Sequence, residues 1–177
     1  LPMPEEFGGS NADALTTVGV LESLGYGCRD NGLVFSLNAQ MWTMQLPLLH
    51  FGSDAQKWRW LPGMISGEVI GGNAMSESEA GSDAFSLHTT ATRDRDAYVL
   101  NGSKLFVTNA GIADVLVVYA TLDRDASQSG ITAFLVERDQ PGLTVRGGVE
   151  KMGMRTSPMG ELFLEDCRVP SSMRLGR

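Results

Sequence analysis

Cysteine and histidine are both scarce in this chain of 177 residues. The two cysteines, Cys28 and Cys167, are far apart and form no CxxC pattern, and the two histidines, His50 and His88, have no partner at metal-ligand spacing. These absences argue against a disulfide framework and against a zinc site. We therefore expect no bound metal and a reducing compartment, which predicts a cytoplasmic protein.

Positive charge and long apolar runs are lacking too. The net charge of −7 argues against nucleic-acid binding, because a binder of the phosphate backbone needs a basic face. No run approaches the ~18 apolar residues of a membrane helix. A hydrophobic content of 42% with 20% charged residues is typical of a globular chain. We expect no nucleic-acid partner and no membrane span.

Several motifs of nucleotide and ester chemistry are missing. The sequence contains neither the GxGxxG loop of dinucleotide-binding folds nor a Walker A loop. It also lacks the GxSxG turn that carries the nucleophile of α/β-hydrolases. A cofactor, if bound, must therefore be held by another arrangement.

The first third of the chain has helical periodicity. Apolar residues recur every three or four positions over 11–24 and again over 32–49. The second segment is rich in methionine and also holds Trp42, which we interpret as core packing rather than a ligand site.

A third helix begins at a capping box formed by Ser53 and Gln56, whose side chains can each bond a free backbone amide of the first turn. Pro62 is expected to kink or end this helix, and Gly67 to stop what remains. We place a domain boundary here, with a helical part at 1–67 and a β-domain at 68–177.

Short strand-like runs follow at regular spacing. The strongest local signal is Asn101-Gly102 between two such runs, which predicts a two-residue hairpin turn because both turn positions need positive φ. The whole set predicts an antiparallel sandwich or barrel. The fold class is therefore α+β, with helices first and strands second.

One strand of this set has a distinctive face. Side chains alternate along a strand, so Phe106 and Thr108 point the same way and Val107 points to the other side. An aromatic ring and a hydroxyl so placed can serve one planar ligand. An ordinary aromatic–threonine pair on a sheet surface fits the same pattern.

The stretch AMSESEAGSD, residues 74–83, contains three serines and three carboxylates. Ser76 follows the apolar run 69–75, where a hydroxyl and open backbone can meet a ligand, and Gly81 permits close approach. Ser82 can cap a turn or bond a ligand. The carboxylates Glu77 and Glu79 suggest acid–base chemistry, but nothing apolar surrounds them in sequence, so we interpret them as a solvated turn.

Six motifs occur in order along nearly the whole chain: LPMPEEFGG, FGSDAQKWRWLPGMISGE, AMSESEAGSD, YVLNGSKLFVTNAG, ITAFLVERDQPG and KMGMRTSPMGELFLEDCRVP. Together they resemble the acyl-CoA dehydrogenase family of flavoproteins. The resemblance implies a helical N-terminal domain and a middle β-domain, with the C-terminal helical bundle of the family absent from this chain.

The resemblance also implies an FAD site. The segment matching 73–82 wraps the flavin ring, with Met75, Ser76, Gly81 and Ser82 as contacts, and Ser76 bonds the pyrimidine side. The segment Phe106, Val107 and Thr108 covers the other side of the ring. Ser82 additionally lies along the channel for the substrate's carrier arm.

The implied reaction is α,β-dehydrogenation of an acyl thioester, carried by CoA or by acyl carrier protein. A carboxylate base removes the α-proton and the β-hydride passes to flavin N5. That glutamate belongs to the missing bundle beyond Arg177, so we expect no catalytic residue in this chain. An electron-accepting partner and a homodimer or homotetramer are implied for the complete protein.

Two departures from the family pattern indicate a specialised member. Ser78 stands where the family usually has proline, and Phe106 where tryptophan is common. A biosynthetic enzyme acting on a carrier-protein thioester fits these changes. Two alternatives stay open: a flavin oxidase or monooxygenase on the same fold, and a non-catalytic binding or assembly fragment.

Overall fold

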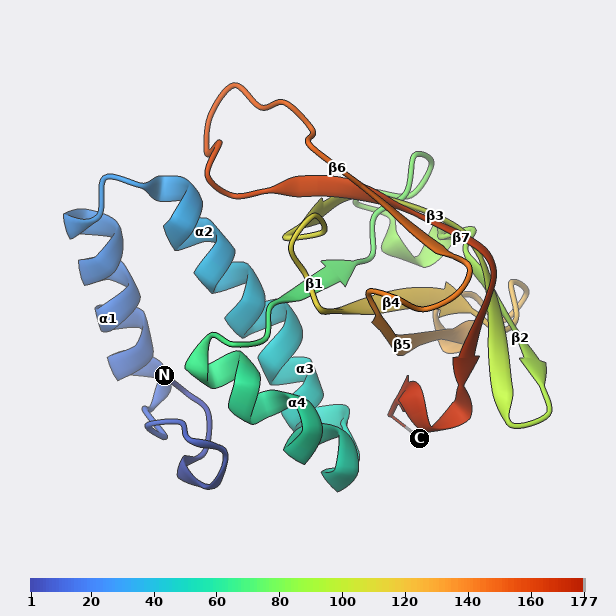
Figure 1. Cartoon of the computed structure of the whole chain (residues 1–177), viewed down its shortest axis with the longest axis horizontal. Coiled ribbons are helices and arrows are strands. Elements are labelled where there is room, and N and C mark those ends of the chain that lie inside the picture. Colours follow the sequence, from blue (N-terminus) through green and yellow to red (C-terminus); the bar gives the residue numbers. More distant parts are fainter. Residues whose placement is uncertain (177) are drawn as a thin grey trace.

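A computed structural model describes residues 1–176. Figure 1 shows the helices gathered on one side of the molecule and the strands on the other. Helices α2 and α3 are joined without a break by a π-helical segment, η2, so that one long helical rod runs alongside the sheet. The helical elements are α1 (Ala14–Gly27), α2 (Asn31–Gln40), η2 (Met41–Gln45), α3 (Leu46–Phe51) and α4 (Asp54–Ser66).

Within residues 1–176 the strands form one eight-stranded sheet in the order β6-β7-β3-β2-β4-β5-β8, with β1 paired to β4. All pairings are antiparallel except β1 with β4 and the single-residue contact of β2 with β4. The predicted α+β class, helical and then mostly antiparallel, is confirmed. The bounds are β1 (Gly71–Ala74), β2 (Thr90–Asp94), β3 (Ala97–Thr108), β4 (Val115–Thr121), β5 (Ile131–Glu137), β6 (Leu143–Gly147), β7 (Met159–Pro170) and β8 (Arg174–Leu175).

The predicted hairpin turn at Asn101-Gly102 is wrong. Both residues lie inside the long strand β3, where Gly102 pairs with Leu164 of β7 beside a register shift. The β2–β3 turn falls instead at 95–96, and Arg95 takes the positive φ of 56°. Gly102 is needed for another reason, since a Cβ there would lie 2.5 Å from the hydroxyl of Thr89.

Most of the features predicted for helix α4 are confirmed. The Ser53–Gln56 capping box is present, and Gly67 ends the helix in the left-handed region at φ 88°. Pro62 does not end the helix, which continues to Ser66. A proline removes one amide hydrogen bond, and here the buried neighbours Trp60 and Leu61 hold the helix against the core across that point.

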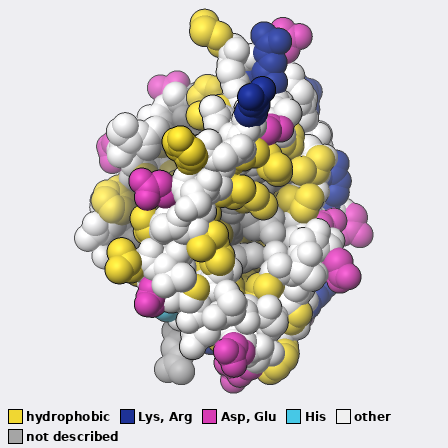
Figure 2. Space-filling model, turned by 90° about the vertical axis from the view of Figure 1, so that its left-hand side faces the viewer, with side chains coloured by type: hydrophobic (Ala, Val, Ile, Leu, Met, Phe, Trp, Pro, Cys, Tyr) yellow, Lys and Arg dark blue, Asp and Glu magenta, His cyan; other side chains and the backbone are white. Residues whose placement is uncertain are grey.

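One hydrophobic core joins the helices to the sheet. Strand β4 is buried on both faces at its centre, and Met44 of η2 and Leu61 of α4 pack into the same cluster. Helix α1 contributes little: Leu15 is 83% exposed and Val18 56% exposed. Figure 2 views the molecule from the side on which α1 lies in Figure 1, and hydrophobic side chains gather there around a central hollow.

Candidate functional site

A cavity of about 360 Å³ lies between the α2–η2 rod and the sheet, at the end of β1 and along β3. This volume is within the usual range for small-molecule sites. Its lining is more apolar than polar and comes from three separate parts of the chain. The lining residues are Phe35, Asn38, Ala39, Trp42, Thr43, Gly71, Gly72, Asn73, Met75, Ser76, Leu105, Phe106 and Thr108.

Strand β3 supplies the aromatic and hydroxyl groups of one wall. Phe106 is 64% exposed with φ 55°, and Thr108 lines the same cavity. Val107 points the other way and is buried in the core. The pairing of β3 with β7 shifts between Lys104 and Val107, a bulge of the kind that re-aims a side chain. Phe106 and Thr108 therefore line the same cavity as predicted, but Leu105 lines it too, so the bulge rather than regular strand alternation sets the direction of Phe106.

The segment after β1 supplies the second wall through Met75 and Ser76. The backbone amide of Leu105 donates a 2.8 Å hydrogen bond to the Ser76 carbonyl, which ties this segment to β3. Within residues 1–176 neither the Ser76 nor the Thr108 hydroxyl has a hydrogen-bond partner. Two unpartnered hydroxyls therefore line the cavity beside an exposed aromatic ring.

Gly81 and Ser82 lie outside this cavity. Both are exposed, and they are absent from its lining. Gly81 has no positive φ, and a Cβ placed on it would meet nothing within 4 Å. Within residues 1–176, Gly81 therefore makes no close approach to another part of the chain.

The interpretation of Glu77 as a solvated turn residue is wrong. Its side chain is only 5% exposed and its Oε1 lies 2.7 Å from Nζ of Lys104, which is fully buried. Glu77 also accepts hydrogen bonds from the amides of His88 and Thr89 and from the Thr89 hydroxyl. Glu79, in contrast, is exposed as predicted. Local sequence gave no sign of this, because all of these partners are distant along the chain.

The environment of the pair affects both protonation equilibria. Burial alone would raise the pKa of Glu77, but hydrogen bonds from Lys104, Thr89 and His88 outweigh it and lower the pKa below 4.5. Burial lowers the pKa of Lys104, and Glu77 offsets only part of that effect. We regard both groups as charged at neutral pH, since each is the other's counter-ion at 2.7 Å.

The helical wall of the cavity was not predicted from the sequence. Phe35, Asn38, Ala39 and Trp42 follow the spacing i, i+3, i+4, i+7, which places them on one helix face, and Thr43 adds to the same wall. Met41 and Met44 are core residues as predicted, but Trp42 is 37% exposed and borders the cavity. The π-helical segment begins at this point, and such segments are frequent at functional sites.

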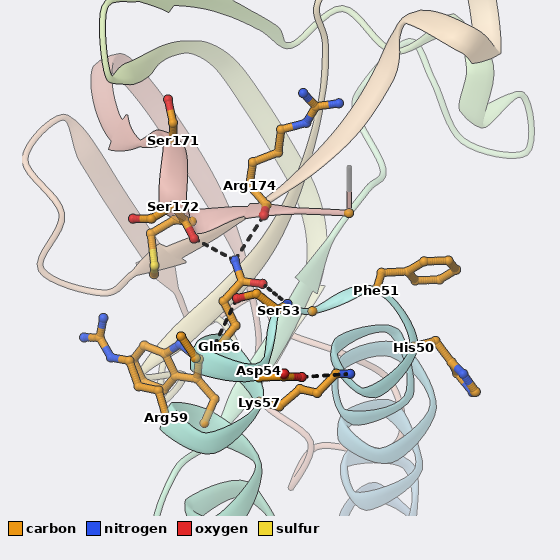
Figure 3. Close-up of a pocket in the computed structure, with 15 residues that line it drawn as sticks. His50, Phe51, Ser53, Asp54, Gln56, Lys57, Arg59, Ser171, Ser172 and Arg174 are labelled. Carbon is orange, nitrogen blue, oxygen red and sulfur yellow. Dashed lines mark hydrogen bonds and ion pairs between the residues drawn. The ribbon is translucent and has the colours of Figure 1, made fainter.

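A second and larger cavity, of about 930 Å³, lies between the start of α4 and the segment 171–176 (Figure 3). Gln56 points into it and donates to the carbonyls of Ser172 and Arg174, at 2.8 and 3.0 Å. Arg59 is paired with Glu137 on β5. The polar groups of this cavity thus hold α4 to the end of the described chain, and we place no chemistry there.

Residues 1–176 contain no group of three or more His, Cys, Asp or Glu side chains able to hold a metal ion. Both cysteines are free, and burial raises the pKa of Cys167 to about 11. None of the described helices is long and apolar enough to cross a membrane.

The N-terminal domain of acyl-CoA dehydrogenases matches residues 1–68, and the middle domain of the same proteins matches residues 72–167. The human mitochondrial short-chain specific acyl-CoA dehydrogenase is 41% identical over 176 residues, which are 99% of this chain and 42% of that protein.

Two solved structures are also similar. The prolyl acyl carrier protein oxidase AnaB has a TM-score of 0.97 and 47% identity, covering 99% of this chain and 47% of its own. PigA in complex with FAD and proline has a TM-score of 0.97 and 40% identity, covering 99% of this chain and 46% of its own. The chain thus spans about half the length of the relatives it matches, and it belongs to the acyl-CoA dehydrogenase family.

Proposed function

We propose that this chain forms the flavin-contacting part of an FAD-dependent enzyme that α,β-dehydrogenates an acyl thioester. The observation that carries the proposal is the convergence of Met75, Ser76, Phe106 and Thr108 on one cavity. These residues come from segments about thirty positions apart in the sequence. The family membership of the chain and the FAD complex of its relative PigA support the same cofactor.

The residues of the cavity fit the ring of a flavin. A planar, aromatic group needs apolar faces and a few polar contacts at its edge, and the cavity offers Phe106, Trp42 and the two hydroxyls of Ser76 and Thr108. In this proposal Phe106 packs on the ring, Ser76 bonds its pyrimidine side, and Thr108 lies near N5. Val107 contributes through its backbone, because its side chain is in the core.

FAD, when bound, supplies the acceptor for the substrate's β-hydride. The residues of this chain orient the ring and exclude water from one side of it, which favours the reaction through positioning. We propose no catalytic acid or base here: Glu77 is engaged with Lys104, and Glu79 is exposed away from the cavity. The base is assigned to a glutamate beyond Arg177.

The remaining assignments follow the family. We propose residues 1–67 as part of a helical domain and 68–177 as the middle β-domain, in a cytoplasmic enzyme with an electron-accepting partner. Gly81 and Ser82 are exposed beside the cavity-lining segment, and we propose both as contacts of the cofactor outside this cavity, with Ser82 also along the route of the substrate's carrier arm.

The test uses the complete gene product. We expect it to purify with a yellow colour, and its flavin band to bleach under anaerobic conditions when an acyl thioester is added, with an artificial acceptor restoring the colour. Offering the same acyl group on CoA and on a carrier protein separates the two substrate classes. A complete product that never binds FAD would overturn the proposal.

A flavin oxidase is the second candidate, and the similarity to the AnaB oxidase favours it. The two reactions share the reductive step and differ in what removes the electrons. Air should reoxidise the reduced flavin of an oxidase within seconds and produce hydrogen peroxide, whereas a dehydrogenase should stay reduced until an acceptor is added. Stopped-flow mixing with oxygenated buffer measures the difference.

A further inference from the structure

We propose that the buried pair Glu77–Lys104 positions the cavity wall formed by Met75 and Ser76, and so sets how the ring-binding surface is presented. These two residues are positioning residues and do not touch the ligand. The identity of the ligand rests on the proposed function, but the geometry of the pair does not.

The pair lies directly behind the cavity wall. Lys104 is completely buried, and its Nζ donates both to Glu77 Oε1, at 2.7 Å, and to the Met75 carbonyl, at 3.2 Å. The next residue of β3, Leu105, donates its amide to the Ser76 carbonyl at 2.8 Å. The two consecutive carbonyls of the wall are therefore both held from β3, one by a side chain and one by the backbone.

Glu77 extends this support to a third segment. Its two carboxylate oxygens accept from the amides of His88 and Thr89, and Oε1 also accepts from the Thr89 hydroxyl at 2.5 Å. The two ends of the loop 77–89 are therefore joined at the carboxylate of Glu77. Movement of Glu77 would release the loop, the start of β2 and the wall together.

The backbone of β3 is shaped to allow this arrangement. Register shifts on either side of Lys104, near Gly102 and before Val107, let Lys104 point inward while Phe106 points into the cavity. Gly102 makes room for Thr89, whose Cα would lie 2.8 Å from a Cβ at that position. The register shift near Gly102 and the one before Val107 therefore both help to bring Lys104 to Glu77.

A purely structural role is the competing explanation. Buried ion pairs often add little net stability, because desolvation of two charges offsets their attraction, and apolar side chains can replace them. The second hydrogen bond of Lys104 separates the two explanations. An apolar replacement would balance the charges but leave the Met75 carbonyl without its donor.

The test uses three variants of the complete gene product, with FAD as the probe. Glu77→Gln removes one charge, Lys104→Met removes the other, and the double variant removes both. We expect each single variant to lose thermal stability and to bind FAD about tenfold more weakly, which corresponds to ~1.4 kcal/mol. In the double variant the unfolding temperature should recover, because no unpaired charge stays buried.

The double variant decides between the explanations. We expect its FAD affinity to stay about tenfold below that of the wild type, a difference of ~1.4 kcal/mol. Its flavin absorption bands should also stay shifted, because the Met75 carbonyl still lacks a donor. Wild-type affinity and an unshifted spectrum in the double variant would overturn the proposal and leave a structural role alone.

Two further variants complete the design. Asp94→Asn breaks the exposed pair with Arg168, outside the cavity lining, and should bind FAD like the wild type. If the charge variants fail to fold, Thr89→Val removes one hydrogen bond to Glu77 and should shift the flavin bands in the same direction; an unchanged spectrum there counts against positioning. A wild-type protein that binds no FAD contradicts the proposed function, whereas equal binding by all variants contradicts only the positioning role.

Discussion

At the residue scale, the two glutamates of AMSESEAGSD have opposite environments although one residue separates them. Glu77 is buried against a lysine and three hydrogen-bond donors, and Glu79 is exposed. The turn that closes between Glu77 and Ala80 sends the two side chains in different directions. A cluster of like residues in sequence therefore gives one structural anchor and one solvated charge.

Acid should weaken the protein through Glu77. Its folded-state pKa lies below the ordinary value of 4.5, so its contribution to the free energy of unfolding is complete above about pH 4.5 and is lost as pH falls through the lowered pKa. Urea unfolding between pH 6 and 3 should show a steeper loss for the wild type than for Glu77→Gln. At pH 7 that variant should already be less stable by about 3 kcal/mol.

The matched control for this measurement is Glu79→Gln. It removes one carboxylate from the same loop, but an exposed one, so its acid profile should follow that of the wild type. Identical profiles for Glu77→Gln and Glu79→Gln would contradict the burial of Glu77.

Ser76 should matter to flavin binding, and Glu79 should not. In the complete protein, Ser76→Ala removes a cavity hydroxyl, and loss of one neutral hydrogen bond of ~1 kcal/mol should weaken FAD binding about fivefold. Fluorescence titration and the flavin absorbance spectrum measure this. Glu79→Gln should change neither, and the reverse outcome would restore an acidic role for the loop.

At the element scale, β3 organises the site. One strand pairs with both β2 and β7, buries Lys104, and presents Phe106 and Thr108 to the cavity. The α2–η2 rod faces it across that cavity. Gln40 ties the rod to the start of β1, because its side chain accepts from the Gly71 amide and donates to the Val69 carbonyl.

Gly102→Ala should destabilise the fold. A Cβ there would lie 2.5 to 2.8 Å from atoms of Thr89, and overpacking of this kind costs roughly 1–3 kcal/mol. Gly25→Ala in α1 is the control, because a Cβ there meets nothing within 4 Å and alanine favours a helix by up to ~1 kcal/mol. Chemical denaturation should therefore move in opposite directions for the two variants. Equal and small effects would mean that Thr89 does not need this space.

At the scale of the whole molecule, the helical layer packs against the sheet, but part of the helical surface is left uncovered. The core is continuous from α4 and η2 to β4 and β5. Helices α1 and α2 leave apolar side chains exposed, which Figure 2 shows as patches on one face. Such exposure in a single chain favours further association.

We expect the complete gene product to be a homodimer or homotetramer. Exposed apolar side chains of α1 and α2, among them Leu15 and Tyr26, provide area whose burial drives association. Sedimentation velocity at micromolar concentration should give a single species of two or four chains. A monomer under these conditions would contradict the expectation.

The sequence by itself determined the features that depend on neighbours along the chain. The capping box at Ser53, the stop at Gly67 and the strand character after 68 are local, so hydrogen bonds and periodicity within a few residues specify them. The family motifs also marked Ser76, Phe106 and Thr108, which the structure brings to one cavity.

Tertiary structure alone decided the rest. Asn101-Gly102 has the best local turn signal, but pairing with β7 and the approach of Thr89 keep it inside a strand. Glu77 is buried because Lys104, 27 residues away, points inward at a bulge. Trp42 borders the cavity because the helical rod packs across the sheet. Each outcome depends on contacts between distant segments, whose energies exceed local preferences and leave no mark in the nearby sequence.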